Sequence, residues 1–170
     1  VYATHTLEIS EKLILNDGIH FNYIGLNAEF DDTTFFPFPF STISQKNTAI
    51  NGNVGLIYLP KEDWRINGIF STGFRAPNVD DLSKVFESVP GKVIVPNPFI
   101  KPEYTYNFEL GIAKTFHKKA TISVNGFYTI YNNAITIQEG QFNGQDSIFY
   151  DGKMSKIITT VNKSEAYLYG

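Results

Sequence analysis

Apolar and polar residues alternate with a period of two along most of the chain, and this alternation predicts β-strands rather than helices. Turn-forming residues separate the alternating segments. The pattern predicts seven strands, over roughly residues 2–15, 19–31, 48–60, 64–74, 104–116, 120–133 and 161–170. The chain is therefore predicted to be all-β.

The connections between the predicted strands alternate strictly between short and long. The short ones are 16–18, 61–63 and 117–119, and the long ones are 32–47, 75–103 and 134–160. A three-residue connection allows only a tight antiparallel hairpin, so the strands are predicted to run up and down. All short turns then lie at one end of the sheet and all long loops at the other. This asymmetry is typical of outer-membrane barrels, which have short periplasmic turns and long extracellular loops.

The fifth predicted strand has two faces of different chemistry. One face is apolar and carries Tyr104, Tyr106, Phe108, Leu110 and Ile112; the other carries Thr105, Asn107, Glu109, Gly111 and Ala113. A charged side chain among small polar ones suits a wet lumen better than a packed core. The fourth and sixth strands alternate in the same way. We therefore expect one face to contact lipid and the other to line a lumen.

The second predicted strand departs from this alternation. Phe21 and Tyr23 share one parity, whereas Leu26, Ala28 and Phe30 share the other. A β-bulge adds one residue to a strand and reverses the parity of the residues after it. The sequence therefore predicts a bulge near Gly25.

Composition narrows the functional classes. The chain has 170 residues, 15% of them aromatic, a net charge of −3 and no cysteine. No basic cluster indicates a nucleic-acid partner, and the absence of thiols excludes disulfides and thiolate metal sites. The sequence contains no catalytic motif, so no enzymatic activity is predicted, and it indicates no metal site and no resident cofactor.

Seven strands with open edges do not form a closed barrel, and unpaired edges are costly in hydrocarbon. We therefore expect the whole of residues 1–170 to be part of the barrel domain of a longer polypeptide. The alternative of another class is a soluble all-β ligand-binding module, in which the aromatic face would be the core.

Two sequence boxes flank the second long connection. The first contains Phe74, Arg75, Ala76 and Pro77, and the second contains Asn97, Pro98, Lys101, Pro102 and Glu103. Each box lies at the end of a predicted strand, and residues 80–88 between them predict a short helix. The paired boxes resemble those in the C-terminal half of TonB-dependent outer-membrane receptors.

The resemblance implies a barrel of about 22 strands with a plugged lumen, of which this chain would form about seven. It implies active import of a scarce, bulky nutrient across the bacterial outer membrane. The implied partners are the TonB complex, reached through parts outside this chain, outer-membrane lipid, a small-molecule or metal-chelate cargo and a surface lipoprotein that could cover the long loops. The plug domain, the signal peptide and the last strands would lie outside residues 1–170.

The cargo is predicted from the boxes. Some haem-uptake members of the family have a histidine between similar boxes that binds the haem iron, but residues 78–96 contain none. His5, His20 and His117 lie in other segments and are not expected to replace it. A ferric siderophore, cobalamin or a similar cargo is therefore favoured, with haem or haemoprotein uptake as the alternative.

Candidate ligand contacts lie in the first long connection and at the first box. The phenylalanines Phe35, Phe36, Phe38 and Phe40 form an apolar run that could stack on a planar ligand, or could pack against neighbouring loops instead. Arg75 is predicted to face the lumen, where it pairs with a plug or loop carboxylate or contacts the ligand.

Overall fold

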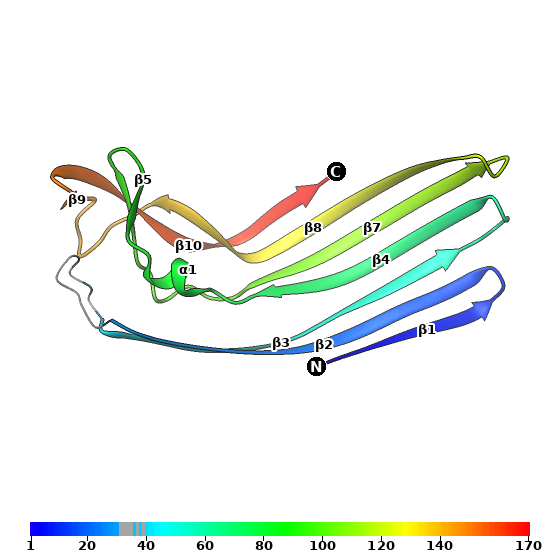
Figure 1. Cartoon of the computed structure of the whole chain (residues 1–170), viewed down its shortest axis with the longest axis horizontal. Coiled ribbons are helices and arrows are strands. Elements are labelled where there is room, and N and C mark those ends of the chain that lie inside the picture. Colours follow the sequence, from blue (N-terminus) through cyan, green and yellow to red (C-terminus); the bar gives the residue numbers. More distant parts are fainter. Residues whose placement is uncertain (31–35, 37, 39) are drawn as a thin grey trace.

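The computed structural model describes residues 1–30, 36, 38 and 40–170 of the chain. Seven long strands follow one another up and down in a single sheet (Figure 1). They are β1 (Tyr2–Ser10), β2 (Leu13–Glu29), β3 (Thr42–Tyr58), β4 (Trp64–Arg75), β7 (Glu103–Phe116), β8 (Ala120–Glu139) and β10 (Lys153–Tyr169). All neighbours among these seven pair in antiparallel fashion, so the predicted all-β, up-and-down arrangement is confirmed.

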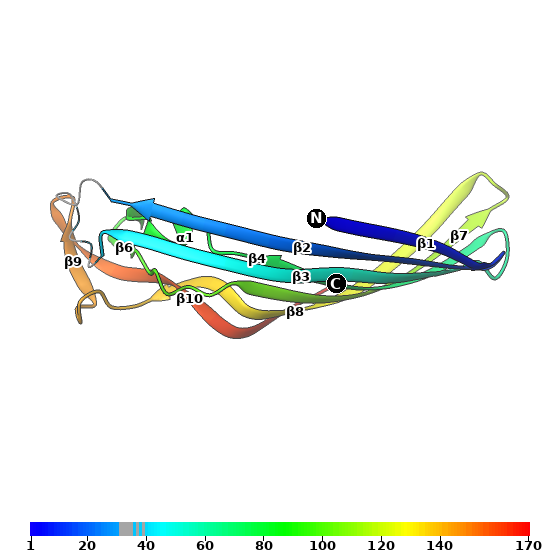
Figure 2. The ribbon, with the colours of Figure 1, turned by 90° about the horizontal axis from the view of Figure 1, so that it is seen from below.

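Short elements occupy the long connections. The helix α1 (Val79–Ser83) and the strands β5 (Phe86–Val89) and β6 (Lys92–Val95) lie between β4 and β7, and β9 (Ser147–Tyr150) lies before β10. These elements gather at one end of the sheet, and the hairpin turns lie at the other (Figures 1 and 2). The predicted separation of short turns from long loops is therefore confirmed. Within the described residues no helix is long and apolar enough to cross a membrane.

The predicted turn at 16–18 is wrong, because these residues lie inside β2 and the first hairpin turns at Glu11 and Lys12. Gly18 serves close strand packing instead of a turn. A Cβ atom at this position would lie 2.8 Å from Oδ1 of Asn53 on β3 and 3.4 Å from Cγ2 of Thr4 on β1. A side chain here would displace the end of the Asn53 side chain, so glycine lets the three strands lie close together, and the turn signal of Asn-Asp-Gly is overridden.

The predicted bulge near Gly25 is also wrong. Strands β2 and β3 pair without a register shift from Leu13 to Glu29. The apolar side chains of β2 change from one face to the other because the surroundings of the two faces change along the strand. Leu26, Ala28 and Phe30 pack on a buried cluster formed by Ile43 of β3, Leu82 of α1 and Ile100. Strand β2 therefore turns apolar side chains outward in its first part and inward, against the loop elements, in its last part.

The outward face is apolar along rows that cross the sheet. Val54, Phe70, Phe108, Tyr128 and Tyr169 are successive partners on five neighbouring strands. Val54 is 44% exposed and Phe108 is 49% exposed. The ring centroids of Phe70 and Phe108 lie 5.0 Å apart. Such an exposed apolar band is what a lipid-facing surface requires. The predicted outward face of the fifth strand is confirmed.

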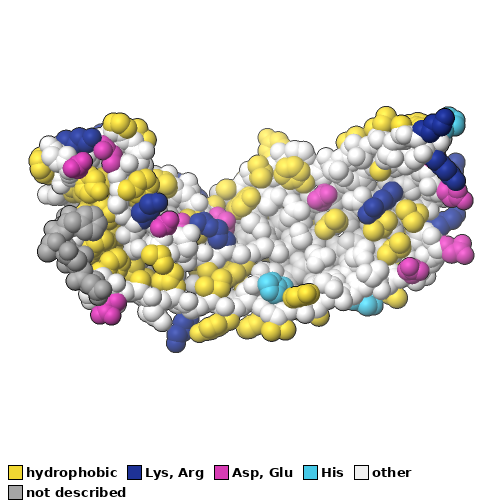
Figure 3. All heavy atoms as spheres, viewed as in Figure 1, with side chains coloured by type: hydrophobic (Ala, Val, Ile, Leu, Met, Phe, Trp, Pro, Cys, Tyr) yellow, Lys and Arg dark blue, Asp and Glu magenta, His cyan; other side chains and the backbone are white. Residues whose placement is uncertain are grey.

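The inner face is polar and rich in small side chains. One row across it contains Thr4, Gly18, Asn53, Ser71 and Asn107 on successive strands. The row continues to Thr129, whose Oγ1 donates to Oδ1 of Asn107 over 2.7 Å. In the space-filling view the middle of the sheet shows few charged side chains (Figure 3). This composition fits the predicted lumen wall.

One hydrogen-bonded polar pair interrupts the apolar outward face. Nδ1 of His5 lies 3.0 Å from Oδ1 of Asp17, and their side chains are 58% and 44% exposed. The strand partners place this pair between the Leu7–Leu15 pair and the Ala3–Ile19 pair. A single polar group facing hydrocarbon is costly, whereas a hydrogen bond between two such groups offsets part of that cost.

We expect His5→Leu to destabilise the folded protein by about 1–2 kcal/mol, because it leaves the Asp17 carboxylate without its hydrogen-bond partner in the apolar band. The double variant H5L/D17L should recover most of this loss, since it removes both polar groups. Thermal midpoints of the full-length protein, followed by the change in gel mobility on unfolding, measure both effects. Equal stability of H5L and wild type would show that the carboxylate does not need His5.

Candidate functional site

The first box leads directly into helix α1, whose cap is Asn78. Oδ1 of Asn78 accepts from the backbone N of Asp81 over 2.8 Å, and Oδ2 of Asp81 accepts from the backbone N of Asn78 over 3.0 Å. This reciprocal capping box satisfies two donors that a helix start otherwise leaves unpaired. The predicted helix over 80–88 is shorter than expected, since it ends at Ser83 and Phe86 begins a strand. Leu82 is fully buried and fixes α1 on the sheet.

Arg75 is held by the same carboxylate. One of its terminal nitrogens, NH2, donates to both oxygens of Asp81 over 2.9 and 2.7 Å. The Asp81 side chain is only 15% exposed, so water screens this pair less than a surface ion pair. Arg75 thus pairs with a loop carboxylate, one of the two partners that the sequence predicted. Its contact with a ligand stays a prediction.

The other residues of the first box shape the strand end. The ring of Phe74 lies at an angle against that of Tyr104 across the β4–β7 pair, with ring centroids 5.3 Å apart. Ala76 is half-buried and Pro77 is buried. The fixed φ of proline ends the strand directly before the helix cap. This box therefore joins the barrel wall to α1.

The second box is bonded to two distant strands. Nε2 of Gln45 on β3 donates to the carbonyl oxygens of Pro98 and Ile100 over 3.2 and 3.1 Å. On β10, Asn162 accepts from the backbone N of Lys101 over 2.8 Å and donates to the Lys101 oxygen over 2.9 Å. The segment therefore bridges the inner side of the sheet from β3 to β10.

The ends of this box are fixed in the same way. Nδ2 of Asn97 donates to the oxygen of Thr160 over 2.9 Å, and Oε2 of Glu103 accepts from the backbone N of Ile135 over 2.8 Å. Pro102 follows Lys101 and is half-buried. Sequence reasoning found the box but missed Gln45 and Asn162, which hold it, because no motif surrounds these two amides.

The phenylalanine run packs against other loops where the structure describes it. Phe36 is 2% exposed and lies in a cluster with Val93, Val95, Phe142 and Ile157. Phe38 packs against this cluster, and Phe40 packs against the cluster around Ile43. Phe35 lies outside the described residues. Phe36 therefore packs among the loops, one of the two roles that the sequence predicted for the run. A ligand contact of the run stays a prediction.

Two short strands extend the same sheet beside the first part of β10. Strand β6 pairs with it in parallel from Lys156 to Thr159, and β9 pairs with its start. Nζ of Lys153 lies 2.7 Å from Oε1 of Glu87 on β5, which also accepts from the backbone N of Gly91 over 2.6 Å. The hydrogen bond from Lys153 is the main cause that lowers the pKa of Glu87, followed by the bond from Gly91.

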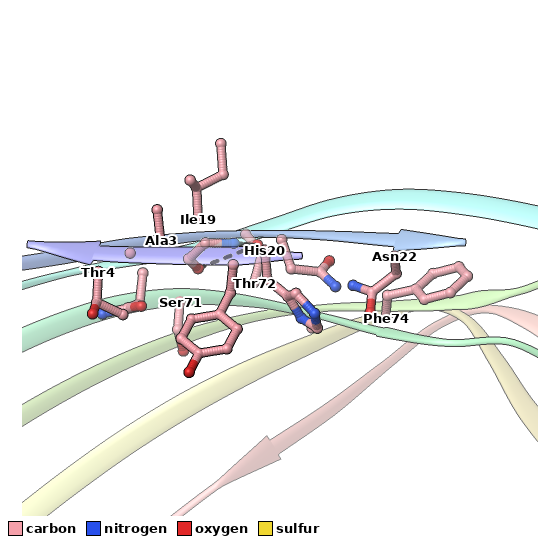
Figure 4. Close-up of a pocket in the computed structure, with 14 residues that line it drawn as sticks. Ala3, Thr4, Ile19, His20, Asn22, Ser71, Thr72 and Phe74 are labelled. Carbon is pink, nitrogen blue, oxygen red and sulfur yellow. Dashed lines mark hydrogen bonds between the residues drawn. The ribbon is translucent and has the colours of Figure 1, made fainter. Parts of the chain in front are cut away.

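The inner face of β1 to β4 forms an open cavity of about 620 Å³. In the close-up His20 and Asn22 point to the side of β2 opposite Ile19 (Figure 4). His20 therefore faces the inside, where its ring lies edge-on to that of Tyr2 with centroids 6.4 Å apart. His5 faces outward in its hydrogen bond with Asp17, and His117 lies in the β7–β8 turn with a φ of 50°.

We expect Asp81→Ala to loosen the β4–β7 connection, since it removes the acceptor for the guanidinium of Arg75 and for the N–H of Asn78. Trypsin cleavage after Lys84 on intact cells should become several-fold faster. Asp80→Ala is the matched control, because Asp80 is 70% exposed and forms only a 3.6 Å pair with Lys84. Equal cleavage of both variants would contradict a role for the Asp81 contacts.

We also expect acid to weaken the contact between β5 and β10. A carboxylate whose pKa is lowered in the folded state stabilises the fold at any pH above its ordinary pKa, about 4.3. This stabilisation disappears as the pH falls through the pKa of the folded state. The protection factor of the Gly91 amide, which compares its exchange rate with the intrinsic rate at the same pH, should therefore fall in the wild type as the pH drops through the lowered pKa of Glu87. The protection factor in Glu87→Gln should change much less over the same range; an identical pH response would exclude Glu87 as the cause.

Comparison with known proteins identifies the family. Residues 1–170 match the family described as TonB dependent receptor-like, beta-barrel. A haemoglobin and haemoglobin-haptoglobin-binding protein of Haemophilus ducreyi is 37% identical over 99 residues, 56% of this chain and 10% of that protein. The haemoglobin-haptoglobin utilization protein B of Neisseria meningitidis serogroup C is 28% identical over 144 residues, 75% of this chain and 16% of that protein.

Solved structures agree on the fold. The haemophore receptor HasR of Serratia marcescens, in a complex with its haemophore and haem, aligns with a TM-score of 0.75 and 17% identity over 99% of this chain and 30% of its own. The ferric enterobactin receptor PfeA of Pseudomonas aeruginosa aligns with a TM-score of 0.67 and 16% identity, over 99% of this chain and 23% of its own. The chain thus spans less than a third of these relatives. It belongs to the TonB-dependent receptor family, whose members are transporters and not enzymes, and forms part of the β-barrel of a bacterial outer-membrane receptor.

Proposed function

We propose that the receptor containing this chain takes up haem from haemoglobin or a similar haemoprotein, with energy delivered through TonB. The observation that carries the proposal is the 37% identity to a relative whose name states that it binds haemoglobin and haemoglobin-haptoglobin. A second relative with a related name is similar over three quarters of the chain. This reverses the order that the sequence favoured, in which siderophore or cobalamin came first.

The site geometry is compatible with a protein ligand. The loop elements form a platform held by hydrogen bonds. The second box is hydrogen-bonded to both β3 and β10, and β6 pairs with the edge of β10. A platform that is ordered before binding loses little entropy when a large partner docks. The siderophore receptors among the solved structures share only about a sixth of their residues with this chain, so their likeness concerns the fold.

The haem iron needs a ligand from outside residues 78–96, which contain no histidine. We propose that the remaining receptor supplies it, together with the plug domain and the segment that contacts TonB. Residues 1–170 then contribute part of the barrel wall and of the extracellular platform. Contacts of Phe35, Phe38, Phe40 and Arg75 with the cargo remain proposals of the same kind.

Growth on single iron sources tests the proposal. We expect an iron-starved strain that lacks this receptor gene to lose growth on haemoglobin and to regain it on complementation. Growth on inorganic iron should be unchanged in both strains, which controls for general defects. Loss of growth on a ferric siderophore, with growth on haemoglobin intact, would overturn the proposal in favour of siderophore uptake.

A further inference from the structure

A groove of about 800 Å³ crosses the outward face of the sheet, over β3, β4, β7 and β8. It passes over Gly68 on β4, which lies between its strand partners Leu56 on β3 and Leu110 on β7. A Cβ atom at Gly68 would meet no other atom within 4 Å. The missing side chain therefore leaves a hollow in an otherwise continuous apolar surface.

The groove is bounded by residues of this chain in the closed barrel as well. Strands β4 and β7 already have a neighbour on each side, so no further strand of the receptor pairs beside them. The outward face of a barrel meets lipid, whereas a plug domain lies in the lumen. The β3–β4 and β7–β8 turns at the near end of the groove are too short to fold back over it. Its natural occupant is therefore a component of the membrane.

A lysine lies at the end of the groove near these turns. Lys114 is the strand partner of Trp64 and shares the outward face with Ile112 and Leu110. Its Nζ lies 4.4 Å from the centroid of the Trp64 ring and 5.5 Å from that of the Phe116 ring. Aromatic rings flank the apolar band of a barrel at the height of the lipid headgroups, and an ammonium over them is attracted to their faces. Lys114 thus places a positive charge where the groove reaches the headgroup layer.

The charge at this end favours an anionic group. Nζ of Lys114 lies 3.5 Å from Oδ2 of Asp63, a contact that uses one of the three N–H donors of the ammonium. Lysines outnumber carboxylates in and beside the two turns: the lysines are Lys61, Lys114, Lys118 and Lys119, and the carboxylates are Glu62 and Asp63. A phosphate oxygen is an acceptor that such ammonium groups bind well.

The length of the groove matches one leaflet of the membrane. From Lys114 to Phe108, β7 rises ~20 Å along its own axis, which a tilt of about 45° reduces to about 14 Å along the membrane normal. Half of a hydrocarbon core of about 30 Å is about 15 Å. The groove therefore extends from the headgroup layer to about the middle of the bilayer, as one acyl chain does.

We propose that this groove is a binding site for one anionic phospholipid of the periplasmic leaflet. The phosphate lies at Lys114, and one acyl chain follows β4 and β7 and fills the hollow over Gly68. The hollow and the charge distinguish this site from the rest of the apolar band, where lipid chains contact a surface without such a depression. The site belongs to the outer wall of the barrel, so it does not depend on which cargo the receptor imports.

Native mass spectrometry of the complete receptor, titrated with phosphatidylglycerol in detergent, tests the proposal by counting bound lipids. We expect one phosphatidylglycerol to bind more tightly than all others. Lys114→Gln should weaken its binding about tenfold, because it removes a charge-assisted contact with the phosphate. Gly68→Leu should weaken it several-fold, because the new side chain occupies the open space of the groove.

Each variant has a matched control that should bind the lipid like the wild type. Gly25→Leu adds the same side chain to another outward glycine, on β2 outside the groove, where the nearest atom to a Cβ is 3.8 Å away. Lys12→Gln removes one positive charge from the β1–β2 turn, at the same end of the sheet. The gel mobility of unheated samples shows that each variant is folded.

Three outcomes would overturn the proposal. Equal affinities of Lys114→Gln and Lys12→Gln would exclude the phosphate contact. Equal affinities of Gly68→Leu and Gly25→Leu would exclude the acyl chain from the groove. A receptor dimer that dissociates in Gly68→Leu would assign the groove to a second copy of the receptor instead of a lipid. Failure of haemoglobin-dependent growth would overturn the proposed function alone, because the lipid titration does not involve the cargo.

Discussion

The pairing of backbone N–H and C=O groups is the constraint on which the rest of this structure depends. Hydrocarbon offers no partners for these groups, so strands that cross it must satisfy one another. Strands β2 and β3 do so over their full lengths without a register shift, and β4, β7 and β8 continue the same ladder. Once the register is fixed, the face on which each side chain lies is fixed as well. An apolar outward row and a polar inner row are direct consequences.

The same constraint explains how one strand serves two environments. Within the apolar band β2 turns Ile19 and Phe21 outward, and beyond it the strand turns Leu26 and Ala28 inward against the loop elements. The register does not change at this point; only the solvent on each face changes. Lipid is replaced by water outside, and the lumen is replaced by packed loops inside. Along the whole strand the apolar side chains lie on the face that is shielded from water. The last part of the strand therefore forms the wall against which the loop elements pack.

The sequence was sufficient for features that depend on local periodicity. Alternation in 104–116 and the short connections at 61–63 and 117–119 predicted the faces and two of the hairpins, and both are confirmed. It failed where a distant contact outweighs a local signal. Gly18 appears in a turn motif, yet it lies inside β2, where it pairs with Thr4 of β1 and Asn53 of β3. The candidate site was predictable in part for the same reason. Both boxes were found from their own residues, whereas Gln45 and Asn162 lie far from them in sequence and carry no signature. Local sequence patterns are thus enough to predict the strands of the barrel wall. The contacts that hold the loop platform can be found only from the tertiary structure.

Proline explains why amide side chains hold the second box. Pro96, Pro98 and Pro102 have no backbone N–H, so this segment cannot join a sheet ladder as a regular strand. Its carbonyl oxygens still need donors, and those of Pro98, Ile100 and Lys101 receive them from Gln45 and Asn162. Side-chain amides thereby replace the missing strand neighbour. Because an amide carries no charge, these bonds do not depend on pH or salt in the way that the Glu87–Lys153 contact does. The second box is therefore ordered by bonds that persist under changing pH and salt, whereas the contact between β5 and β10 depends partly on an ion pair.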